Sequence, residues 1–241
     1  MVRFSILVMS FTTKIQSYDG VGKFNVYVAE PDGRPRGAVI VIQEIFGVDT
    51  DIRWRCDLLA QNGYLAIAPD LFWRLDPGME LDPDIKSAMK RSVDVVIRFN
   101  TDKGVHDVQS TINKAREIVG NKAKIGLIGY CLGGRMAAFA SARTDIDAAV
   151  SYYGVQIERM LGEKDAIRNP LMLHMPEFDE HVGQEIQNQI HAAFDGNEQI
   201  TIFDYPGQHH GFACALGKRR SEATAKVADE RTAQFLAEHI G

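Results

Sequence analysis

The sequence predicts an α/β fold with a mostly parallel central sheet and helices on both of its faces. Short runs rich in β-branched residues alternate with segments of helical periodicity along the chain. One run, residues 38–42 (AVIVI), is entirely apolar, as a central strand covered on both faces is. The 241 residues contain no repeat or linker. We therefore expect one domain over residues 13–241, preceded by an extension, residues 1–12, for which no ordered structure is predicted.

Each element follows from a local pattern. Residues 23–29 alternate apolar and polar side chains, as a half-exposed edge strand does, whereas 50–62 has helical spacing that stops at Gly63. Prolines and a glycine make residues 71–83 a loop. Further strands are expected at 38–42, 64–68, 124–128, 148–152, 171–174 and 199–203, and further helices at 85–99, 105–119, 135–142, 183–194 and 222–240.

Composition excludes several classes of protein. The 27 basic and 32 acidic side chains give a net charge of −5, which argues against a nucleic-acid binder. No apolar stretch approaches the ~20 residues of a membrane span. The spacing of Cys56, Cys131 and Cys214 fits neither a disulfide framework nor a zinc site. We expect a reduced, cytoplasmic protein without a metal or other cofactor.

The most informative motif is Gly-x-Cys-x-Gly-Gly at residues 129–134, between a predicted strand and a predicted helix. This pattern is typical of a nucleophile elbow, a turn so tight that small residues must stand two before and two after the nucleophile. Gly129 and Gly133 occupy those positions. The turn also places Cys131 at a helix N-terminus, where the helix dipole favours the thiolate. A buried structural cysteine or a phosphate-binding turn is the alternative interpretation.

An acid and a histidine follow in the chain order of the α/β hydrolases. Asp179 follows one predicted strand and His210 follows the next, so both fall at the carboxyl edge of the sheet, where open α/β sheets place their sites. Loop position favours this pair, although Glu177, Glu180 and His209 compete for the two roles. A metal site built from His174, Asp179, His181 and His209 is conceivable, but the spacing is not that of a helical two-histidine ligand set.

The segment after the 38–42 strand supplies a further part of the predicted site. In this fold the second oxyanion-hole donor comes from that position. We expect the backbone N–H groups of Leu132 and Ile45 to stabilise an oxyanion. Glu44 beside them is either an exposed loop carboxylate or a hydrogen-bond partner of the Cys131 thiol in the resting enzyme.

Taken together, these residues resemble the dienelactone hydrolase (carboxymethylenebutenolidase) family, over more than nine-tenths of the chain. The landmarks are residues 43–48 (QEIFGV), 69–71 (PDL), 129–134 (GYCLGG), 152–155 (YYGV) and 210–212 (HGF). The resemblance implies a Cys131–Asp179–His210 triad, with Glu44 keeping the thiol neutral until substrate displaces it. It also implies an ester or lactone hydrolase that acts on a small molecule through an acyl-enzyme. We expect a monomer or a weak homo-oligomer.

The sequence departs from the family where the substrate is bound. Well-studied members hold the substrate carboxylate with two arginines, whose positions here fall at Met89 and Cys214. Neither can form the bidentate pair of an arginine. We expect Arg74 to border the pocket and Arg91, Lys90 or the 218–220 cluster to be available as substitutes. The hypothesis is that the hydrolytic residues are retained while the preferred substrate is not the usual anionic dienelactone.

Two other functions remain open at the level of sequence. A thioesterase or acyltransferase could use the same triad. A non-catalytic redox sensor could instead read the oxidation of Cys131, although sensing alone would not require Asp179 and His210.

Overall fold

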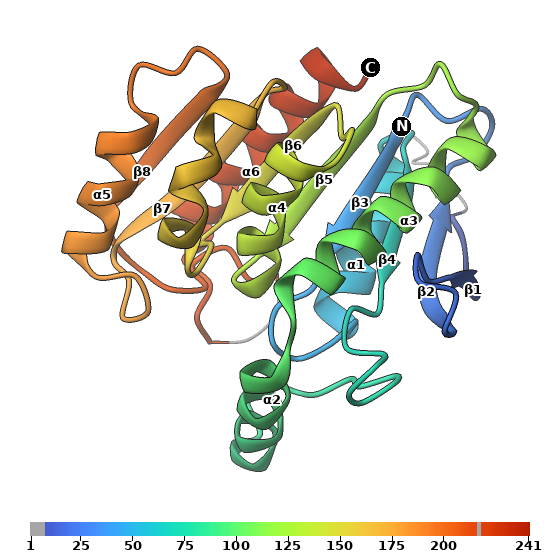
Figure 1. The fold of residues 1–241 in the computed structure, drawn as a ribbon, viewed down its shortest axis with the longest axis horizontal. Coiled ribbons are helices and arrows are strands. Elements are labelled where there is room, and N and C mark those ends of the chain that lie inside the picture. The colour runs from blue at the N-terminus through green and yellow to red at the C-terminus, as the bar shows by residue number, and fades with distance from the viewer. Residues whose placement is uncertain (1–7, 216–217) are drawn as a thin grey trace, which may run out of the picture.

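The computed structural model describes residues 8–215 and 218–241 as an α/β structure (Figure 1). In that part of the chain, no helix has the length and apolar character needed to cross a membrane. In chain order the elements are β1 (Met9–Gln16), β2 (Lys23–Glu30), β3 (Ala38–Ile42), α1 (Thr50–Gln61), β4 (Leu65–Pro69), α2 (Lys86–Arg98), α3 (Thr101–Val119), β5 (Ile125–Tyr130), α4 (Leu132–Arg143), β6 (Ala148–Tyr152), the 3₁₀ helix η1 (Ile157–Ala166), β7 (Leu171–Phe178), α5 (Gln184–Phe194), β8 (Ile200–His209) and α6 (Glu222–His239).

The eight strands form one sheet in the order β1-β2-β4-β3-β5-β6-β7-β8. From β4 to β8 every neighbouring pair is parallel, whereas β1 pairs antiparallel with β2 and β2 antiparallel with β4. The predicted mostly parallel sheet is therefore confirmed. The strand predicted as an edge, β2, is covered by β1.

The N-terminal boundary of the folded part differs from the expectation. The sequence predicts an extension over residues 1–12, but β1 begins at Met9; residues 1–7 lie outside the described residues. Most side chains of β1 are exposed. An exposed outer strand carries little hydrophobic pattern, which explains why the sequence did not indicate it.

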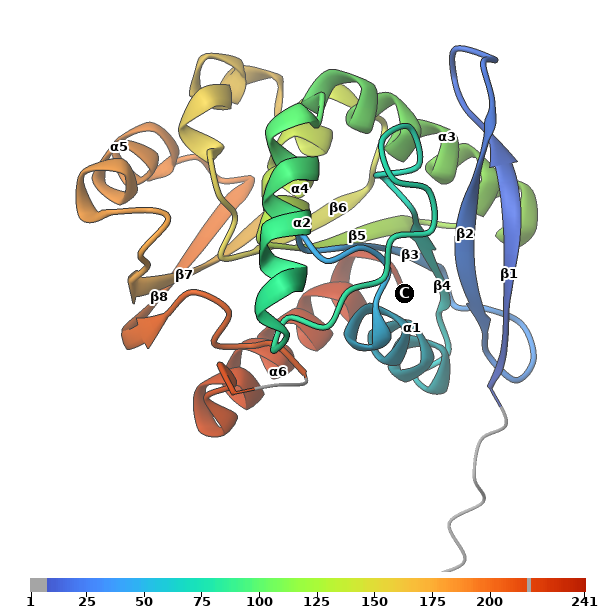
Figure 2. The same ribbon diagram turned by 90° about the horizontal axis from the view of Figure 1, so that it is seen from below.

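Helices cover both faces of the sheet. Seen from below, α1 and α6 lie on one side and α3, α4 and α5 on the other (Figure 2). The central strands β3, β4 and β5 are buried along their whole length. Their side chains divide between two core clusters, one shared with α3 and α4 and the other with α1 and α6.

Several elements extend beyond their predicted ends. β7 continues to Phe178 and β8 to His209, so Asp179 and His210 are the first residues after their strands. The helix α3 begins at Thr101, where the Asn100 side chain accepts a hydrogen bond from the Lys103 N–H at 2.9 Å. The helix η1 was not predicted.

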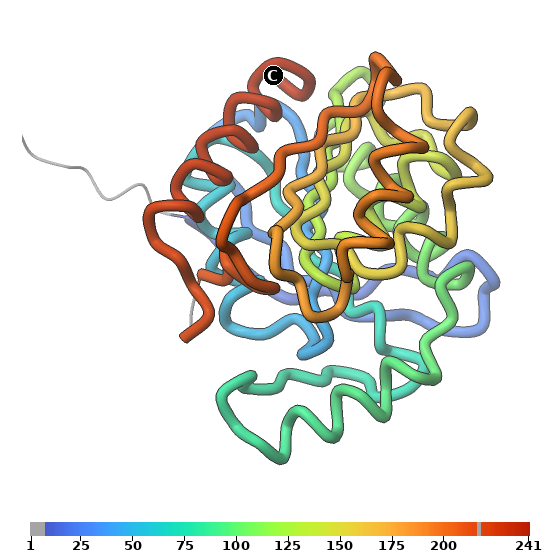
Figure 3. Tube along the Cα trace, turned by 90° about the vertical axis from the view of Figure 1, so that its left-hand side faces the viewer, coloured from blue at the N-terminus to red at the C-terminus, as the bar shows by residue number. Residues whose placement is uncertain are grey.

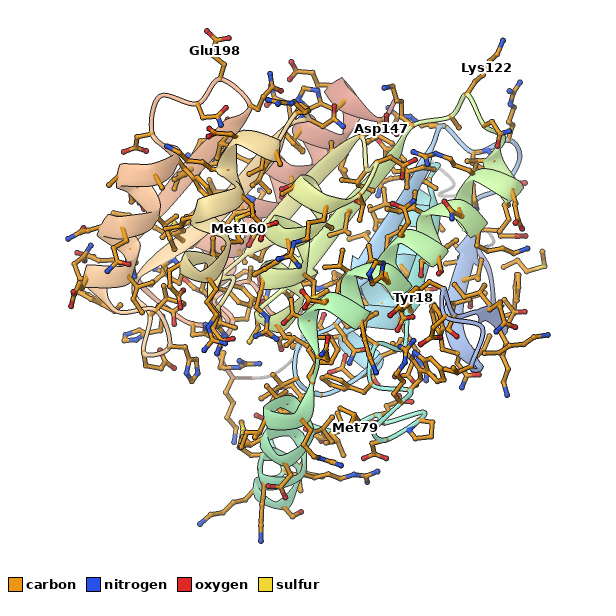
Figure 4. The ribbon with its side chains drawn as sticks, in the orientation of Figure 1. Tyr18, Met79, Lys122, Asp147, Met160 and Glu198 are labelled. Atoms are coloured by element: carbon orange, nitrogen blue, oxygen red, sulfur yellow. The ribbon has the colours of Figure 1, made fainter. Side chains whose placement is uncertain are left out.

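The carboxyl edge of the parallel strands carries the long loop after β4 and the helix α2, which stands off from the body of the molecule (Figure 3). Lys122, Asp147 and Glu198, which precede β5, β6 and β8, mark the opposite edge (Figure 4). Met79 anchors the loop beside α2 in a small cluster that includes Val95 of α2. Because Leu132 belongs to the same cluster, α2 is packed next to the residue that follows Cys131.

Candidate active site

The turn between β5 and α4 has the geometry of a nucleophile elbow. Cys131 adopts a φ of 55° and a ψ of −109° directly before the first residue of α4. A positive φ is unusual for a residue with a side chain and marks a strained turn. The Cys131 N–H donates to the Tyr152 carbonyl at 3.0 Å and its carbonyl accepts from the Val155 N–H at 3.3 Å. The neighbouring strand β6 and its loop therefore hold the strained residue in place.

The glycines of the motif are required by close backbone contacts. A Cβ on Gly129 would lie 1.9 Å from the Gly133 carbonyl oxygen, and a Cβ on Gly133 would lie 2.4 Å from the Ile42 carbonyl oxygen. A Cβ on Gly134 would lie 2.7 Å from the Gly154 Cα. Since all three contacts are with backbone, no side-chain movement would relieve them. The motif is thus explained by sterics at the junction of β3, β5 and α4.

The expected acid and base are paired at the carboxyl edge. His210 Nδ1 donates to Asp179 Oδ2 at 2.9 Å, and both side chains are almost completely buried. The second carboxylate oxygen accepts the N–H groups of His181 at 2.8 Å and Val182 at 3.2 Å. These bonds orient the carboxylate, which in turn orients the imidazole ring.

Electrostatics favour a protonated His210. Burial opposes the charge, but the Cys131 sulfur and the Asp179 carboxylate together raise the pKa of His210 to about 10. The other ring nitrogen, Nε2, is buried and has no hydrogen-bond partner within the described ranges. The Tyr153 ring packs edge-on against the imidazole with centroids 4.9 Å apart, and the His181 ring does so at 4.7 Å.

Of the residues that compete for the role of the acid, Glu177 accepts a hydrogen bond from the Gly207 N–H, and Glu180 accepts one from the His210 N–H at 3.4 Å.

The two predicted oxyanion donors lie beside the elbow. Leu132 is the first residue of α4 and is fully buried, while Ile45 follows β3 and is partly buried. Neither N–H donates a hydrogen bond to another group in the described part of the chain. Both amides are therefore free to bind a developing negative charge.

The Glu44 carboxylate has partners other than the expected one. Arg219 Nη2 donates to Glu44 Oε2 at 3.0 Å, and the Cys214 sulfur lies 3.7 and 3.8 Å from the two carboxylate oxygens. Burial and the Glu44 charge raise the pKa of Cys214, which is therefore a neutral thiol that donates to the carboxylate. Within the described residues, no hydrogen bond joins Glu44 to Cys131. The structure thus corrects the expected resting contact of Glu44 by pairing it with Arg219 and Cys214.

A cavity of about 620 Å³ opens beside this cluster. Glu44, Cys214 and Arg219 line it on the side of the triad, since Cys214 contacts the Tyr153 hydroxyl at 3.6 Å and Tyr153 packs on His210. The remaining lining residues are Asp49, Thr50, Asp51, Glu80, Leu81, Asp82, Pro83 and Asp84. The wall away from the triad is therefore strongly acidic.

Only some of the predicted substrate-binding residues reach the cavity. Cys214 does, but Arg74 binds Asp107 and Asp19 on the side of α3, and Arg91 binds Asp76 through bonds of 2.7 and 2.8 Å. Met89 lies on α2 with an exposed side chain and does not line the cavity. Arg74, Arg91 and Met89 therefore do not line this cavity, whereas Arg219, a member of the 218–220 cluster expected as a substitute, does.

The conceivable metal ligands have other partners. His174 is buried between the Tyr205 hydroxyl at 2.7 Å and the Thr232 hydroxyl at 3.0 Å. Burial lowers the pKa of His174 to about 3, so the ring is neutral. His174 and Asp179, two of the four conceivable metal ligands, are therefore engaged in hydrogen bonds within the protein. Across the described residues, no group of three or more His, Cys, Asp or Glu side chains is arranged to hold a metal ion.

Comparison with known proteins agrees with this geometry. The family model described as the dienelactone hydrolase family matches residues 24–240. The carboxymethylenebutenolidase of Pseudomonas putida is 34% identical over 223 residues, covering 92% of this chain and 94% of that protein. The carboxymethylenebutenolidase 1 of Cupriavidus pinatubonensis is 32% identical over 229 residues, covering 95% and 97%.

Solved structures show the same architecture. A Klebsiella pneumoniae protein provisionally assigned as a dienelactone hydrolase superposes with a TM-score of 0.85 at 26% identity, covering 97% of this chain and all of that one. A Pyrococcus furiosus esterase, at 14% identity, shares the fold with a TM-score of 0.70. The chain is therefore an α/β-hydrolase-fold enzyme and belongs to the dienelactone hydrolase family.

Proposed function

We propose that the enzyme hydrolyses a small carboxylic ester or lactone through a Cys131–His210–Asp179 triad and a covalent acyl-enzyme. The observation that carries the proposal is the buried His210–Asp179 pair, whose imidazole is close enough to Cys131 for the sulfur to raise the His210 pKa. The family supports the reaction class, because its relatives are named carboxymethylenebutenolidases.

In the first half-reaction, His210 already carries the proton of the Cys131 thiol, and the thiolate attacks the substrate carbonyl carbon. The carbonyl oxygen becomes an oxyanion bound by the N–H groups of Leu132 and Ile45. The tetrahedral intermediate then collapses, the C–O bond to the leaving group breaks, and the His210 imidazolium protonates that oxygen. The Asp179 carboxylate stabilises the imidazolium throughout.

In the second half-reaction, His210 accepts a proton from water and the resulting hydroxide attacks the thioester carbonyl. The same two N–H groups bind the oxyanion. The C–S bond breaks, which restores the Cys131 thiolate beside the His210 imidazolium, and the carboxylic acid is released. For a lactone, the acid and the alcohol leave as one ring-opened molecule.

Variants of Cys131 test this function. Cys131→Ala and Cys131→Ser should lose hydrolysis of p-nitrophenyl acetate, whereas Cys56→Ala should keep it because Cys56 is buried in α1. Full activity in Cys131→Ala would overturn the proposed nucleophile.

We also infer that the preferred substrate is not an anionic lactone. The guanidinium that lines the cavity, Arg219, is already paired with Glu44, and among the described residues the other charged groups of the wall are carboxylates. A substrate carboxylate would have to displace Glu44 and then remain among like charges. The measurement is the ratio of kcat/KM for p-nitrophenyl acetate to that for p-nitrophenyl hemisuccinate. A ratio above one at low ionic strength that falls with added salt supports the inference, and a ratio below one contradicts it.

A further inference from the structure

A buried arginine in α1 connects the two loops of the triad. Arg55 is only 6% exposed, and its Nη1 donates to the Tyr130 hydroxyl at 2.7 Å. Its Nη2 donates to the Ala213 carbonyl oxygen. Its carbon Cζ also lies 3.9 Å from the centre of the Tyr130 ring. One guanidinium thus contacts the residue before Cys131 and the loop that follows His210.

Asp51, one helical turn earlier, completes the connection. Its Oδ1 accepts Arg55 Nε at 3.0 Å, and its Oδ2 accepts the Ala215 N–H at 2.9 Å. Although burial opposes the charge, Tyr130 and Asp51 raise the pKa of Arg55, which therefore stays protonated. The pair holds two backbone groups of the 213–215 segment from the same face of α1.

The sheet alone does not fix the distance that this pair spans. The nucleophile follows β5 and the histidine follows β8, and β6 and β7 lie between these strands. Small changes of twist in two intervening strands would add up at their ends, where a shift of about 1 Å matters for proton transfer. Hydrogen bonds that join the two loops directly would keep the distance between them constant when the twist changes.

We propose that Arg55, oriented by Asp51, is a positioning residue that holds the His210 loop in register with the Cys131 elbow. The inference rests on the proposed triad. It assigns to Arg55 no contact with substrate and no proton transfer. Its effect is to keep His210 within reach of the Cys131 sulfur.

The test compares Arg55→Met and Arg55→Lys with Arg143→Met. Arg143 is a matched control because it also joins separate segments, through Asp102 and Glu163, at the opposite end of α4. Each protein is assayed for kcat and KM on p-nitrophenyl acetate and for melting temperature. Each is also assayed for the pH dependence of Cys131 alkylation by iodoacetamide, read by peptide mass spectrometry.

We expect Arg55→Met to lower kcat about 10- to 100-fold with less than a 3-fold change in KM. The pH at which Cys131 alkylation is half-maximal should rise, because a displaced His210 stabilises the thiolate less. Arg55→Lys should recover only part of kcat, since an ammonium cannot reproduce the fork of three contacts. Arg143→Met should lower the melting temperature and leave kcat and the alkylation profile unchanged.

Other outcomes overturn the inference. If folded Arg55→Met keeps the wild-type kcat and alkylation profile, Arg55 is only structural. If Arg55→Met does not fold, Asp51→Asn is the deciding variant, because it keeps the shape of the side chain and loses the charge that orients Arg55. An unchanged alkylation profile in Asp51→Asn then contradicts the proposal. Failure of the proposed function would be seen separately, as hydrolysis that survives Cys131→Ala.

Discussion

The two halves of the site differ in how they are held. The triad is fixed by backbone: Cys131 sits in a strained turn between glycines in steric contact, and the His210–Asp179 pair is buried. The cavity wall combines two buried carboxylates, Glu44 and Asp49, with charged side chains that water reaches. Its pair between Arg53 and Glu80 is about 40% exposed on both sides, and Arg219 is 37% exposed.

This difference predicts different tolerance to change. Exposed ion pairs contribute about 0–1 kcal/mol to stability and are weakened by salt, so they can be exchanged at little cost. Buried pairs and glycines in close backbone contact cannot be exchanged at little cost, because each substitution leaves an unpaired group or creates a clash. We therefore expect substitutions in the triad to abolish catalysis, and substitutions in the cavity wall to change the substrate preference.

The largest effect is expected at the elbow. Gly129→Ala would place a Cβ 1.9 Å from a carbonyl oxygen and should abolish hydrolysis and destabilise the fold by ~2–3 kcal/mol or more. Gly162→Ala is the control, because nothing lies within 4 Å of its Cβ. Urea unfolding and p-nitrophenyl acetate hydrolysis measure both. A folded, active Gly129→Ala would show that the turn is less constrained than we describe.

Asp179→Asn should have the next largest effect. An amide in place of the carboxylate no longer stabilises the imidazolium, and losses of kcat near ~10⁴-fold are typical of such a change in a triad. A matched control is Asp195→Asn, which alters an exposed His191–Asp contact of 3.2 Å and should leave kcat unchanged. Equal kcat losses in the two variants would remove the special role of Asp179.

Changes in the cavity wall should alter substrate preference more than chemistry. Arg219→Met leaves the Glu44 carboxylate without its cation, so an anionic substrate meets a more negative wall. We expect the neutral-to-anionic kcat/KM ratio to rise about 10-fold, equivalent to ~1.4 kcal/mol. Arg91→Met should leave the ratio unchanged because its partner, Asp76, does not line the cavity. An equal change of this ratio in Arg219→Met and Arg91→Met would contradict the assignment of substrate preference to the cavity wall.

The smallest effect concerns pH and stability at Asp49. Burial, reinforced by Glu44 and Asp51, raises the pKa of Asp49 to about 7 from its ordinary 3.8. As pH rises, the unfolded chain releases this proton before the folded chain does, so stability falls between about pH 4 and pH 7. Asp49→Asn keeps a side chain able to cap α1 through the Ile52 N–H and cannot ionise.

We therefore expect the stability of Asp49→Asn relative to wild type to increase between pH 4 and pH 8. The expected gain is on the order of 1 kcal/mol or more. Urea unfolding at both pH values measures it. If the difference in free energy of unfolding between Asp49→Asn and wild type does not change with pH, Asp49 ionises normally in the folded protein.

The difference between a triad fixed by backbone and a wall built from side chains also explains what the sequence could predict. Residues 129–134 encode the elbow through sterics that act over a few residues, and strand order along the chain places Asp179 and His210 at one edge. The strands and most helices follow from local periodicity in the same way. These features depend on short-range patterns that a single sequence contains.

The wall depends on which distant side chains meet, and there local pattern is not informative. Arg74 and Arg91 looked available, but each has a nearer carboxylate, Asp107 and Asp76. Arg219 was one of three adjacent basic residues with nothing to distinguish it. Arg55 gave no signal either, because its partners Tyr130 and Ala213 lie 75 and 158 residues away.

The most direct test of the account is to trap the acyl-enzyme. Rapid mixing of the enzyme with excess p-nitrophenyl acetate, an acid quench within the first turnover and peptide mass spectrometry would locate the acetyl group. The account predicts a burst close to one equivalent of p-nitrophenol and acetylation of the peptide that contains Cys131. Turnover without a burst, or with the acetyl group on another residue while Cys131 stays free, would contradict it.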